Sequence, residues 1–378
     1  MDRVNVVIIG GGVVGCAIAR ELSRHVQDVF LLEQSPRLGM ATSTRNSGVI
    51  HSGIYYPPEF LKARFCVEGN RLTKEFCAAH GVPHRNCGKI VVAKDATEIA
   101  ELEKLAENGR RNGVEGLKIV GPERIRQLEP HIRVAAALEV PSTAIVSAEE
   151  LVKAFARLAT DQGASILTNA RVTNLEGKAD GIAVGVELGD PGAGEALTQE
   201  TVEAHCVVNS AGLYADEVAA LLGNRSYRIY PVRGEYAEVV RARADLVNAL
   251  VYPLPLHDRL SLGAHLTKTL WGTVLVGPTA RYVEDKTDYE RDRLPLEEFL
   301  EDARGLLPEL HLEDLRLAYS GLRPKLVPPS GHGMADFVIT RDPTYPRAIH
   351  LVGIESPGLT SAPAIARHVA ALVSETLD

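Results

Sequence analysis

The chain has 378 residues, more than one hydrophobic core usually supports, so we expect two closely joined lobes. Its 45% hydrophobic and 24% charged residues are ordinary for a soluble globular protein, and no apolar run reaches the roughly 18 residues of a membrane-spanning helix. The formal net charge of −8 offers no basic face to a nucleic-acid backbone, so we expect no nucleic-acid partner.

The N-terminal segment and the cysteines favour a cytoplasmic protein. The first apolar run, Val4–Val14, contains three glycines and lacks the small-residue end of a cleavage site, so we do not interpret it as a signal peptide. The scattered cysteines never follow the CxxC spacing, which favours reduced, mostly buried thiols, and we expect no metal site. The cysteines are Cys16, Cys66, Cys77, Cys87 and Cys206.

The N-terminal pattern predicts a strand, a turn, a helix and a second strand. Val4–Ile9 is a largely apolar β-branched run, which is typical of a parallel strand covered on both faces. The glycine-rich turn Gly10–Gly15 follows and leads into a helix that extends to about His25. Val29–Leu32 forms the next strand and ends at Glu33.

A second α/β stretch is predicted in the middle of the chain. Ser147 and Glu150 form a capping box before a helix over Leu151–Gln162. Strands are expected at Ser165–Thr168, Arg171–Leu175, Ile182–Leu188 and Cys206–Ser210.

The C-terminal part repeats this theme, and the remaining segments differ from it. A strand over Ile349–Ile354 and a turn at Ser356–Gly358 precede a helix over Leu359–Leu377. The other predicted strands, typical of a largely antiparallel sheet, are Gly88–Ala93, Tyr230–Val240, Ala249–Pro253 and Val274–Gly277.

The glycine-rich turn indicates a dinucleotide. In this GxGxxG motif, Gly10 permits the tight turn, Gly12 lets a diphosphate approach the backbone, and Gly15 lets the helix pack closely on the strand. Glu33, at the end of the second strand, can accept hydrogen bonds from a ribose and would repel a 2′-phosphate, which argues against NADP. A merely tight glycine turn is the alternative.

The segment after Glu33 favours FAD over NAD. Residues 34–52 form a polar irregular stretch rather than a further βαβ unit, and such a stretch suits a long, extended cofactor. An ordinary polar loop would have the same composition.

The chain resembles the D-amino-acid oxidase / glycine oxidase superfamily of FAD-dependent oxidoreductases. Within it, the resemblance is closest to L-2-hydroxyglutarate dehydrogenases and oxidases, and it extends in order from residue 1 to the C-terminal SPGLTSA. The motifs that carry it are Arg45–Tyr56 (RNSGVIHSGIYY), Phe65–Leu72 (FCVEGNRL), Arg233–Tyr236 (RGEY) and Leu262–Thr267 (LGAHLT).

Two features depart from the hydroxyglutarate enzymes. The segment from about Lys286 to Leu310 is shorter, and Gly321–Pro324 reads GLRP, as in glycine and D-amino-acid oxidases. Both departures fall in the substrate lobe, so they leave the substrate open.

The resemblance implies an α/β fold with an α+β second lobe. A Rossmann-like FAD-binding domain is expected from the discontinuous segments 1–80, 146–225 and 338–378. A mixed, largely antiparallel β-sheet substrate domain, formed by 81–145 and 226–337, is inserted into it.

The resemblance also implies a set of contacts to non-covalent FAD. Glu33 would hold the adenosine ribose, Val172 would meet the adenine through its backbone, and Gly212 would close over the adenosine end. Helix 359–377 would begin under the flavin, where its N-terminus stabilises negative charge. The expected FAD-binding residues are Gly10, Gly12, Val13, Val14, Gly15, Glu33, Gln34, Thr42, Ser43, Asn46, Ser47, Gly48, Val49, Val172, Ala211, Gly212, Gly353, Gly358, Leu359 and Thr360.

Four residues are candidates for the chemistry. Arg323, in GLRP, offers a planar bidentate fork that would anchor a substrate carboxylate. His265 and His51 titrate near neutrality, so either could take a hydroxyl proton, with His51 expected close to the flavin and His265 opposite it. Tyr252 could reach a carboxylate, although core tyrosines are common.

Other polar residues are assigned more loosely. Tyr55 and Tyr56 could complete the pocket. Arg233 could hold a distal carboxylate or form a structural ion pair with Glu235 or Glu238. Glu68, Asn70 and Arg71 are interpreted as a helix surface.

The leading hypothesis is oxidation of L-2-hydroxyglutarate or a similar 2-hydroxy acid to the 2-oxo acid, by hydride transfer to flavin N5. An amine oxidase acting on glycine, sarcosine or D-amino acids is the first alternative, and a non-catalytic flavin-binding redox carrier is the second. The electron acceptor is left open among oxygen, a quinone and an electron-transfer partner. A quinone would imply peripheral contact with the inner membrane.

Overall fold

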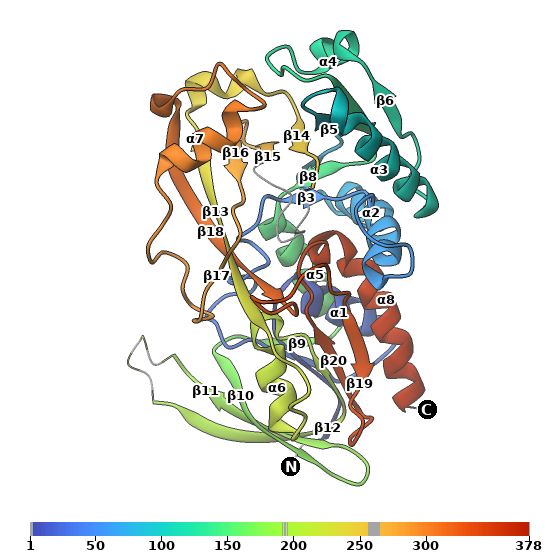
Figure 1. Ribbon diagram of the computed structural model, residues 1–378. Coiled ribbons are helices and arrows are strands. Elements are labelled where there is room, and N and C mark those ends of the chain that lie inside the picture. The colour runs from blue at the N-terminus through green and yellow to red at the C-terminus, as the bar shows by residue number, and fades with distance from the viewer. Residues whose placement is uncertain (1–2, 191, 193, 195, 256–264, 378) are drawn as a thin grey trace.

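The computed structural model describes residues 3–190, 192, 194, 196–255 and 265–377. Two large β-sheets, one above the other in Figure 1, are each covered by helices. The predicted mixed α/β fold is confirmed.

The lower sheet in Figure 1 contains eight strands. Five of them run parallel in the order β20-β12-β1-β2-β9, which is the Rossmann-like core. An antiparallel pair, β10 and β11, extends β12, and β19 lies antiparallel against β20. The strands are β1 (Arg3–Ile9), β2 (Val29–Leu32), β9 (Ser165–Leu167), β10 (Ala170–Gly177), β11 (Ile182–Leu188), β12 (Thr198–Asn209), β19 (Val338–Arg341) and β20 (Ala348–Val352).

The apolar run of β1 is buried on both faces, as its sequence predicts. Val6 and Ile8 belong to the core between the sheet and the helices α1 (Val13–Leu22), α2 (Leu61–His80), α5 (Ala148–Asp161) and α8 (Gly358–Leu377). Val7 and Ile9 face a second core, which β10, β11 and α6 (Ala215–Leu221) complete. Alternate side chains of one strand therefore hold both layers together.

The upper sheet contains nine strands, in the order β17-β13-β16-β15-β14-β5-β7-β6 with β18 beside β13. Its pairs are antiparallel except that β14 and β5 run parallel, so the sheet is mixed and largely antiparallel, as predicted. The strands are β5 (Lys89–Ala93), β6 (Lys118–Val120), β7 (Ala136–Val140), β13 (Tyr230–Val239), β14 (Leu250–Pro253), β15 (His265–Lys268), β16 (Val274–Gly277), β17 (Arg281–Tyr282) and β18 (Leu315–Lys325).

Smaller elements complete the fold. The strands β3 (Val49–Ile50), β4 (His84–Arg85) and β8 (Ala144–Val146) form a three-stranded antiparallel sheet that the sequence did not indicate. Helices α3 (Ile99–Arg111), α4 (Pro122–Leu128) and α7 (Leu296–Arg304) lie beside the upper sheet (Figure 1). Short 3-10 turns cover Ala96–Glu98, Gly212–Tyr214, Arg241–Leu246 and Leu312–Asp314.

Several predicted boundaries were wrong, and two of them have a clear physical reason. Helix α5 begins at Ala148, not Leu151, because Ser147 itself is the N-cap and accepts a hydrogen bond from the Glu150 backbone. Strand β12 begins at Thr198 rather than Cys206, because its polar first half pairs with β11 along an exposed edge.

The strands of the lower sheet fall within 1–80, 146–225 and 338–378, and those of the upper sheet within 81–145 and 226–337. The division into two domains at these boundaries stays a prediction.

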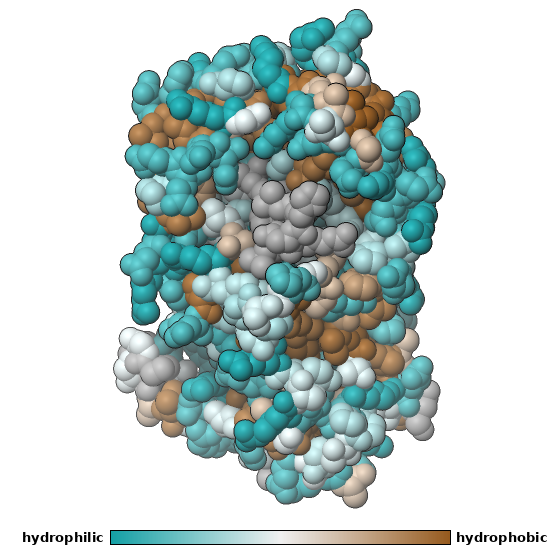
Figure 2. Space-filling view, in the orientation of Figure 1, coloured by the Kyte–Doolittle hydropathy of each residue, from teal (hydrophilic) through white to brown (hydrophobic). Residues whose placement is uncertain are grey.

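The surface seen in Figure 2 is mostly hydrophilic, with hydrophobic residues in scattered patches. Within the described ranges, no helix is long and apolar enough to cross a membrane. The cysteines of the chain are free, as expected, and all except Cys87 are buried.

Candidate active site

A cavity of about 1150 Å³ lies between the two large sheets. Its lining includes the glycine-rich turn and the end of β2 from the lower sheet, and parts of β14, β15 and β18 from the upper sheet. This volume exceeds the usual range for one small ligand, so it can hold a dinucleotide together with a small substrate.

The turn after β1 has the geometry that a diphosphate needs. Gly10 adopts a φ of +103°, and a Cβ there would lie 2.7 Å from the carbonyl oxygen of Ser210. A Cβ on Gly15 would lie 2.0 Å from the carbonyl oxygen of Gly10, so helix α1 can pack on the turn only with glycine at this position. Helix α1 begins at Val13 after the N-cap Gly12, and no acidic residue lies in its first turn. The Ser43 hydroxyl accepts a hydrogen bond from the Val13 N–H at 2.9 Å, and no charged side chain caps this end. The N-terminal dipole of α1 is therefore available to an anion in the cavity.

Glu33 lies beside this turn. Its carboxylate accepts hydrogen bonds from the backbone N–H groups of Gly11, at 2.7 Å, and Ser35, at 2.8 Å. These bonds hold the side chain at the end of β2 while it lines the cavity. The turn and Glu33 together fit the diphosphate and ribose of FAD.

The structure brings sixteen of the twenty predicted cofactor residues to the cavity wall. Some of their side chains also hold the wall in shape: the Thr42 hydroxyl donates to the carbonyl oxygen of Leu322 at 2.9 Å, and the Asn46 amide donates to that of Ser43 at 2.7 Å. The lining residues are Gly10, Gly12, Val13, Val14, Glu33, Gln34, Thr42, Ser43, Asn46, Ser47, Val49, Val172, Ala211, Gly212, Gly358 and Leu359.

The four other predicted residues, Gly15, Gly48, Gly353 and Thr360, do not line the cavity. Gly48 and Gly353 adopt positive φ angles of 65° and 72°, where a Cβ would also meet Val146 and Leu326 respectively. Thr360 is fully buried, and its hydroxyl oxygen accepts a hydrogen bond from the His51 backbone N–H at 2.9 Å. These four residues therefore pack behind the residues that line the cavity.

Arg323 lines the cavity from β18 and stands directly over Gly234 of β13. A Cβ on Gly234 would lie 2.7 Å from its guanidinium, so glycine makes room for this side chain. One guanidinium nitrogen donates to the carbonyl oxygen of Thr279 at 3.2 Å. No carboxylate of the described residues pairs with Arg323, so its remaining donors are available to a substrate anion.

The two candidate bases line the same cavity and come from different elements. His51 follows β3 beside the start of α8, and His265 lies on β15, where its ring stacks on Tyr252 at a centroid distance of 3.7 Å. Nδ1 of His51 and Nε2 of His265 are buried and have no hydrogen-bond partner among the described residues.

Both imidazoles are neutral at working pH. Burial, followed by the charge of Lys89, lowers the pKa of His51 to about 3. The same two causes, with smaller effects from His51 and Arg323, hold the pKa of His265 well below its usual range. A neutral imidazole has a free lone pair, so either ring can accept a proton.

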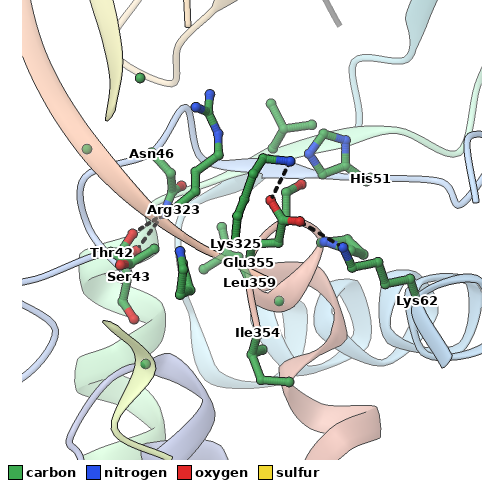
Figure 3. Close-up of a pocket in the computed structure, with 18 of the residues that line it drawn as sticks. Thr42, Ser43, Asn46, His51, Lys62, Arg323, Lys325, Ile354, Glu355 and Leu359 are labelled. Carbon is green, nitrogen blue, oxygen red and sulfur yellow. Dashed lines mark hydrogen bonds and ion pairs between the residues drawn. The ribbon is translucent and has the colours of Figure 1, made fainter. Parts of the chain in front are cut away.

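Among the charged lining residues that the sequence did not indicate, three form one cluster. Glu355 lies between two lysines, 2.9 Å from Nζ of Lys62 and 3.4 Å from Nζ of Lys325 (Figure 3). Burial alone would raise the pKa of Glu355, but the two ammonium groups hold it below its usual value. The only signal for Lys62 in the sequence is its spacing: it lies three and four residues before Phe65 and Cys66, on the buried face of the same helix.

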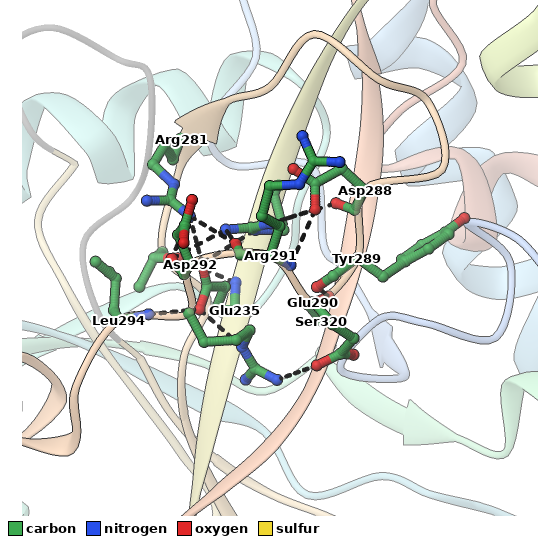
Figure 4. Close-up of polar contacts among 12 residues, drawn as sticks. Glu235, Arg281, Asp288, Tyr289, Glu290, Arg291, Asp292, Leu294 and Ser320 are labelled. Atoms are coloured by element: carbon green, nitrogen blue, oxygen red, sulfur yellow. Dashed lines mark hydrogen bonds and ion pairs between the residues drawn. The ribbon is translucent and has the colours of Figure 1, made fainter.

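For Arg233 the sequence left two roles open, a contact to a distal substrate carboxylate and a structural ion pair. The structure supports the ion pair. Its side chain is fully buried and does not line the cavity. It pairs with Glu235 at 3.1 Å and Asp288 at 2.8 Å, and Glu235 also binds Arg293 at 2.8 Å. Figure 4 shows this cluster fastening the segment around Asp288–Leu294 to β13. Arg233 therefore does not hold a distal carboxylate.

The interpretation of Asn70 as helix surface was wrong. Its side chain is buried, and its amide donates to the carbonyl oxygens of His51 and Ser142, both at 2.9 Å. Arg71, by contrast, is exposed and pairs with Glu75. Tyr55 and Tyr56 line the cavity as expected. In the ranges described, no cluster of His, Cys, Asp or Glu side chains is arranged to hold a metal ion.

A family model described as FAD dependent oxidoreductase matches residues 5–372. The chain therefore belongs to this family, as its resemblance predicted; it is an oxidoreductase, and its cofactor is FAD.

Its relatives include L-2-hydroxyglutarate dehydrogenases. The mitochondrial enzyme of Arabidopsis thaliana is 36% identical over 98% of this chain and 83% of its own length. The enzyme of Escherichia coli strain K12 is 33% identical over 98% of this chain and 93% of its own length. Among solved structures, an L-α-glycerophosphate oxidase from Mycoplasma pneumoniae with FAD bound has a TM-score of 0.87 at 29% identity, covering 99% of this chain and 95% of that one.

Proposed function

We propose that the protein oxidises L-2-hydroxyglutarate, or a closely similar 2-hydroxy acid, to the corresponding 2-oxo acid. One arrangement carries this proposal: an arginine without a carboxylate partner among the described residues and two neutral histidines face the same cavity as the dinucleotide turn. The similarity to L-2-hydroxyglutarate dehydrogenases over nearly the whole chain supports it.

Arg323 would bind the carboxylate next to the carbon that is oxidised. Its planar fork fixes the orientation of a carboxylate better than an ammonium group does, because two parallel N–H donors meet the two oxygens. Its position over Gly234 holds the guanidinium in the cavity wall. Such positioning contributes to the rate by holding the reacting carbon in one place.

One of the two histidines would accept the proton of the substrate hydroxyl. Bound FAD supplies the two-electron oxidant, which takes the hydrogen of the same carbon as a hydride. The pKa values of the two histidines are low in the protein alone. A bound carboxylate would offset the charge of Lys89 and raise both pKa values, so the base becomes stronger once substrate is present.

Anaerobic bleaching of the flavin absorbance by a substrate panel tests the proposal. L-2-hydroxyglutarate is expected to reduce the flavin faster than glycine, sarcosine or D-amino acids, and Arg323→Lys is expected to lower kcat/KM roughly tenfold or more. Turnover with oxygen, a quinone analogue and a dye would then identify the electron acceptor. Reduction by amino acids alone would replace the proposal with the amine oxidase alternative, which GLRP supports.

A second candidate substrate is glycerol 3-phosphate. The structural likeness to an L-α-glycerophosphate oxidase, at 29% identity, favours it. Its phosphate would take the place of the carboxylate at Arg323, and its secondary hydroxyl would meet the same histidines. Adding glycerol 3-phosphate to the same panel decides between the two, because the true substrate is expected to bleach the flavin much faster than the other candidate.

A further inference from the structure

Lys89 is a second buried lysine close to the active site, at the start of β5. Its side chain is 3% exposed. Side chains alternate along a strand, so Lys89 shares a face with Val91 and Ala93, and both of these belong to the core that contains Tyr55 and Tyr252. The residue does not line the cavity itself but stands behind residues that do.

Two tyrosines surround the ammonium group. Nζ of Lys89 donates a hydrogen bond to the Tyr55 hydroxyl at 3.3 Å and lies 4.5 Å from the centre of that ring. It lies 4.8 Å from the centre of the Tyr252 ring, which in turn stacks on His265. Lys89 therefore touches two residues of the cavity wall.

No carboxylate of the described residues lies within ion-pair distance of Lys89. Lys62, which is 2% exposed, shows the contrast, because Glu355 pairs with it at 2.9 Å. A buried charge is costly unless an opposite charge offsets it, and aromatic faces offset only part of the cost. Among the described residues, the site around Lys89 is therefore one negative charge short of balance.

We propose that Lys89 supplies a second positive charge for a doubly negative substrate, acting through Tyr55 as a positioning residue while Arg323 binds the first acidic group. This rests on the proposed function, because it takes Arg323 as the site of the first carboxylate. The ligand class is a small dianion, whose second acidic group is a carboxylate or a phosphate.

Tyr55 connects Lys89 to the cavity. Its oxygen accepts the hydrogen bond from Lys89, so its own O–H is directed elsewhere, and Tyr55 lines the cavity. A hydroxyl that accepts from a cation becomes a stronger donor. The second acidic group would receive this hydrogen bond and the attraction of the ammonium behind it.

The charge state of Lys89 is set within the range where the enzyme can be assayed. Burial lowers the pKa of Lys89 to about 7. The titratable and charged groups that face it are His51 and Tyr55, Cys66 from α2, Tyr252 from β14 and His265 from β15. None of these is a carboxylate, so a bound dianion is the group that would favour the protonated lysine.

Binding of unreactive ligands to the oxidised holoenzyme tests the proposal without turnover. Glutarate and the monoanion valerate would be titrated at about pH 6.5 and about pH 9, and 3-phosphonopropionate at about pH 6.5, with the flavin absorbance change giving each Kd. At the lower pH we expect a dianion to bind about tenfold more tightly than valerate, and this preference to shrink at the higher pH as Lys89 loses its proton. Glutarate and 3-phosphonopropionate each carry a carboxylate and one further acidic group, so together they distinguish a carboxylate from a phosphate-like group as the second group.

Three variants complete the experiment. K89M is expected to lose the preference at both pH values, and K89R to keep it at the higher pH because a guanidinium stays charged. K74M is the matched control: Lys74 is a half-buried lysine on α2 outside the cavity lining, so the preference is expected to persist. Flavin content and Tm check that each variant is folded.

Retention of the dianion preference in K89M, with normal flavin content, would overturn the proposal. So would an equal preference at both pH values in the unaltered protein. Turnover of L-2-hydroxyglutarate is measured separately. Its absence, together with a preference that K89M abolishes, would refute the proposed substrate and leave the role of Lys89 standing.

Discussion

His51 is held by its backbone while its side chain is left free. Its N–H donates to the Thr360 hydroxyl and its carbonyl oxygen accepts from the Asn70 amide. Its Nδ1 is buried without a partner among the described residues. His265 has a comparable free nitrogen, and its ring is fixed by stacking on Tyr252. Both imidazoles are therefore oriented and available to accept a proton.

Replacing each histidine by glutamine separates their roles. Glutamine keeps a buried polar side chain but cannot accept a proton, so loss of the base is expected to slow flavin reduction roughly 10²–10⁴-fold. The other variant should lose much less. Anaerobic stopped-flow reduction by L-2-hydroxyglutarate measures both, and full activity in both variants would exclude either imidazole as the base.

At the scale of elements, the close packing of α2 against α8 determines the position of the cavity wall around His51. A Cβ on Gly69 of α2 would lie 2.3 Å from the carbonyl oxygen of Thr360 in α8. The Thr73 hydroxyl donates to this same oxygen at 3.0 Å. The helices can approach this closely only because residue 69 is glycine, and this approach brings Thr360 to the backbone of His51.

Gly69→Ala is therefore expected to destabilise the protein and weaken FAD binding. An added methyl group against a backbone atom forces the helices apart, at a cost of typically about 1–3 kcal/mol. Thermal unfolding and the Kd for FAD measure the two effects. Gly121→Ala is the control, because a Cβ there meets no atom within 4 Å and φ is −89°. An equal loss of Tm in both variants would contradict the role of this close packing.

At the scale of the whole molecule, the protein buries a lysine, Lys89, behind the cavity wall, and burying its charge lowers the stability of the fold. Burial lowers the pKa of Lys89 to about 7, against 10.5 for an ordinary lysine. Between these values the unfolded chain binds a proton that the folded chain does not, so folding stability rises with pH. Below about pH 7 both states are protonated and the folded state bears the full cost of burying the charge.

K89M removes this cost, so its Tm should exceed that of the unaltered protein by a few degrees near pH 6. The difference should shrink as the pH approaches about 10, where both states are neutral. Thermal unfolding of FAD-saturated protein at several pH values measures it. A difference independent of pH would show that folding leaves the pKa of Lys89 unchanged, and it would contradict a cost of burying its charge. Greater stability with weaker dianion binding is the combination that a purely structural lysine would not give.

The sequence by itself determined the features that depend on neighbouring residues. The apolar run of β1, the Gly10–Gly15 turn and Glu33 follow one another within one βαβ unit, so their spacing alone predicted the dinucleotide site. Four strands of the second sheet, β5, β13, β14 and β16, were also recognisable from their local sequence.

Only the tertiary structure decided which polar residues share the cavity. Lys62 and Glu355 lie 293 positions apart, and Thr360 lies 309 positions from His51. Arg233 could equally have faced a substrate, and its burial against Glu235 and Asp288 depends on how β13 meets a distant segment. Lys89 begins an apolar strand and gives no sign of its tyrosine neighbours. Charge balance in a buried site is a property of the assembled contacts, so local patterns cannot reveal it.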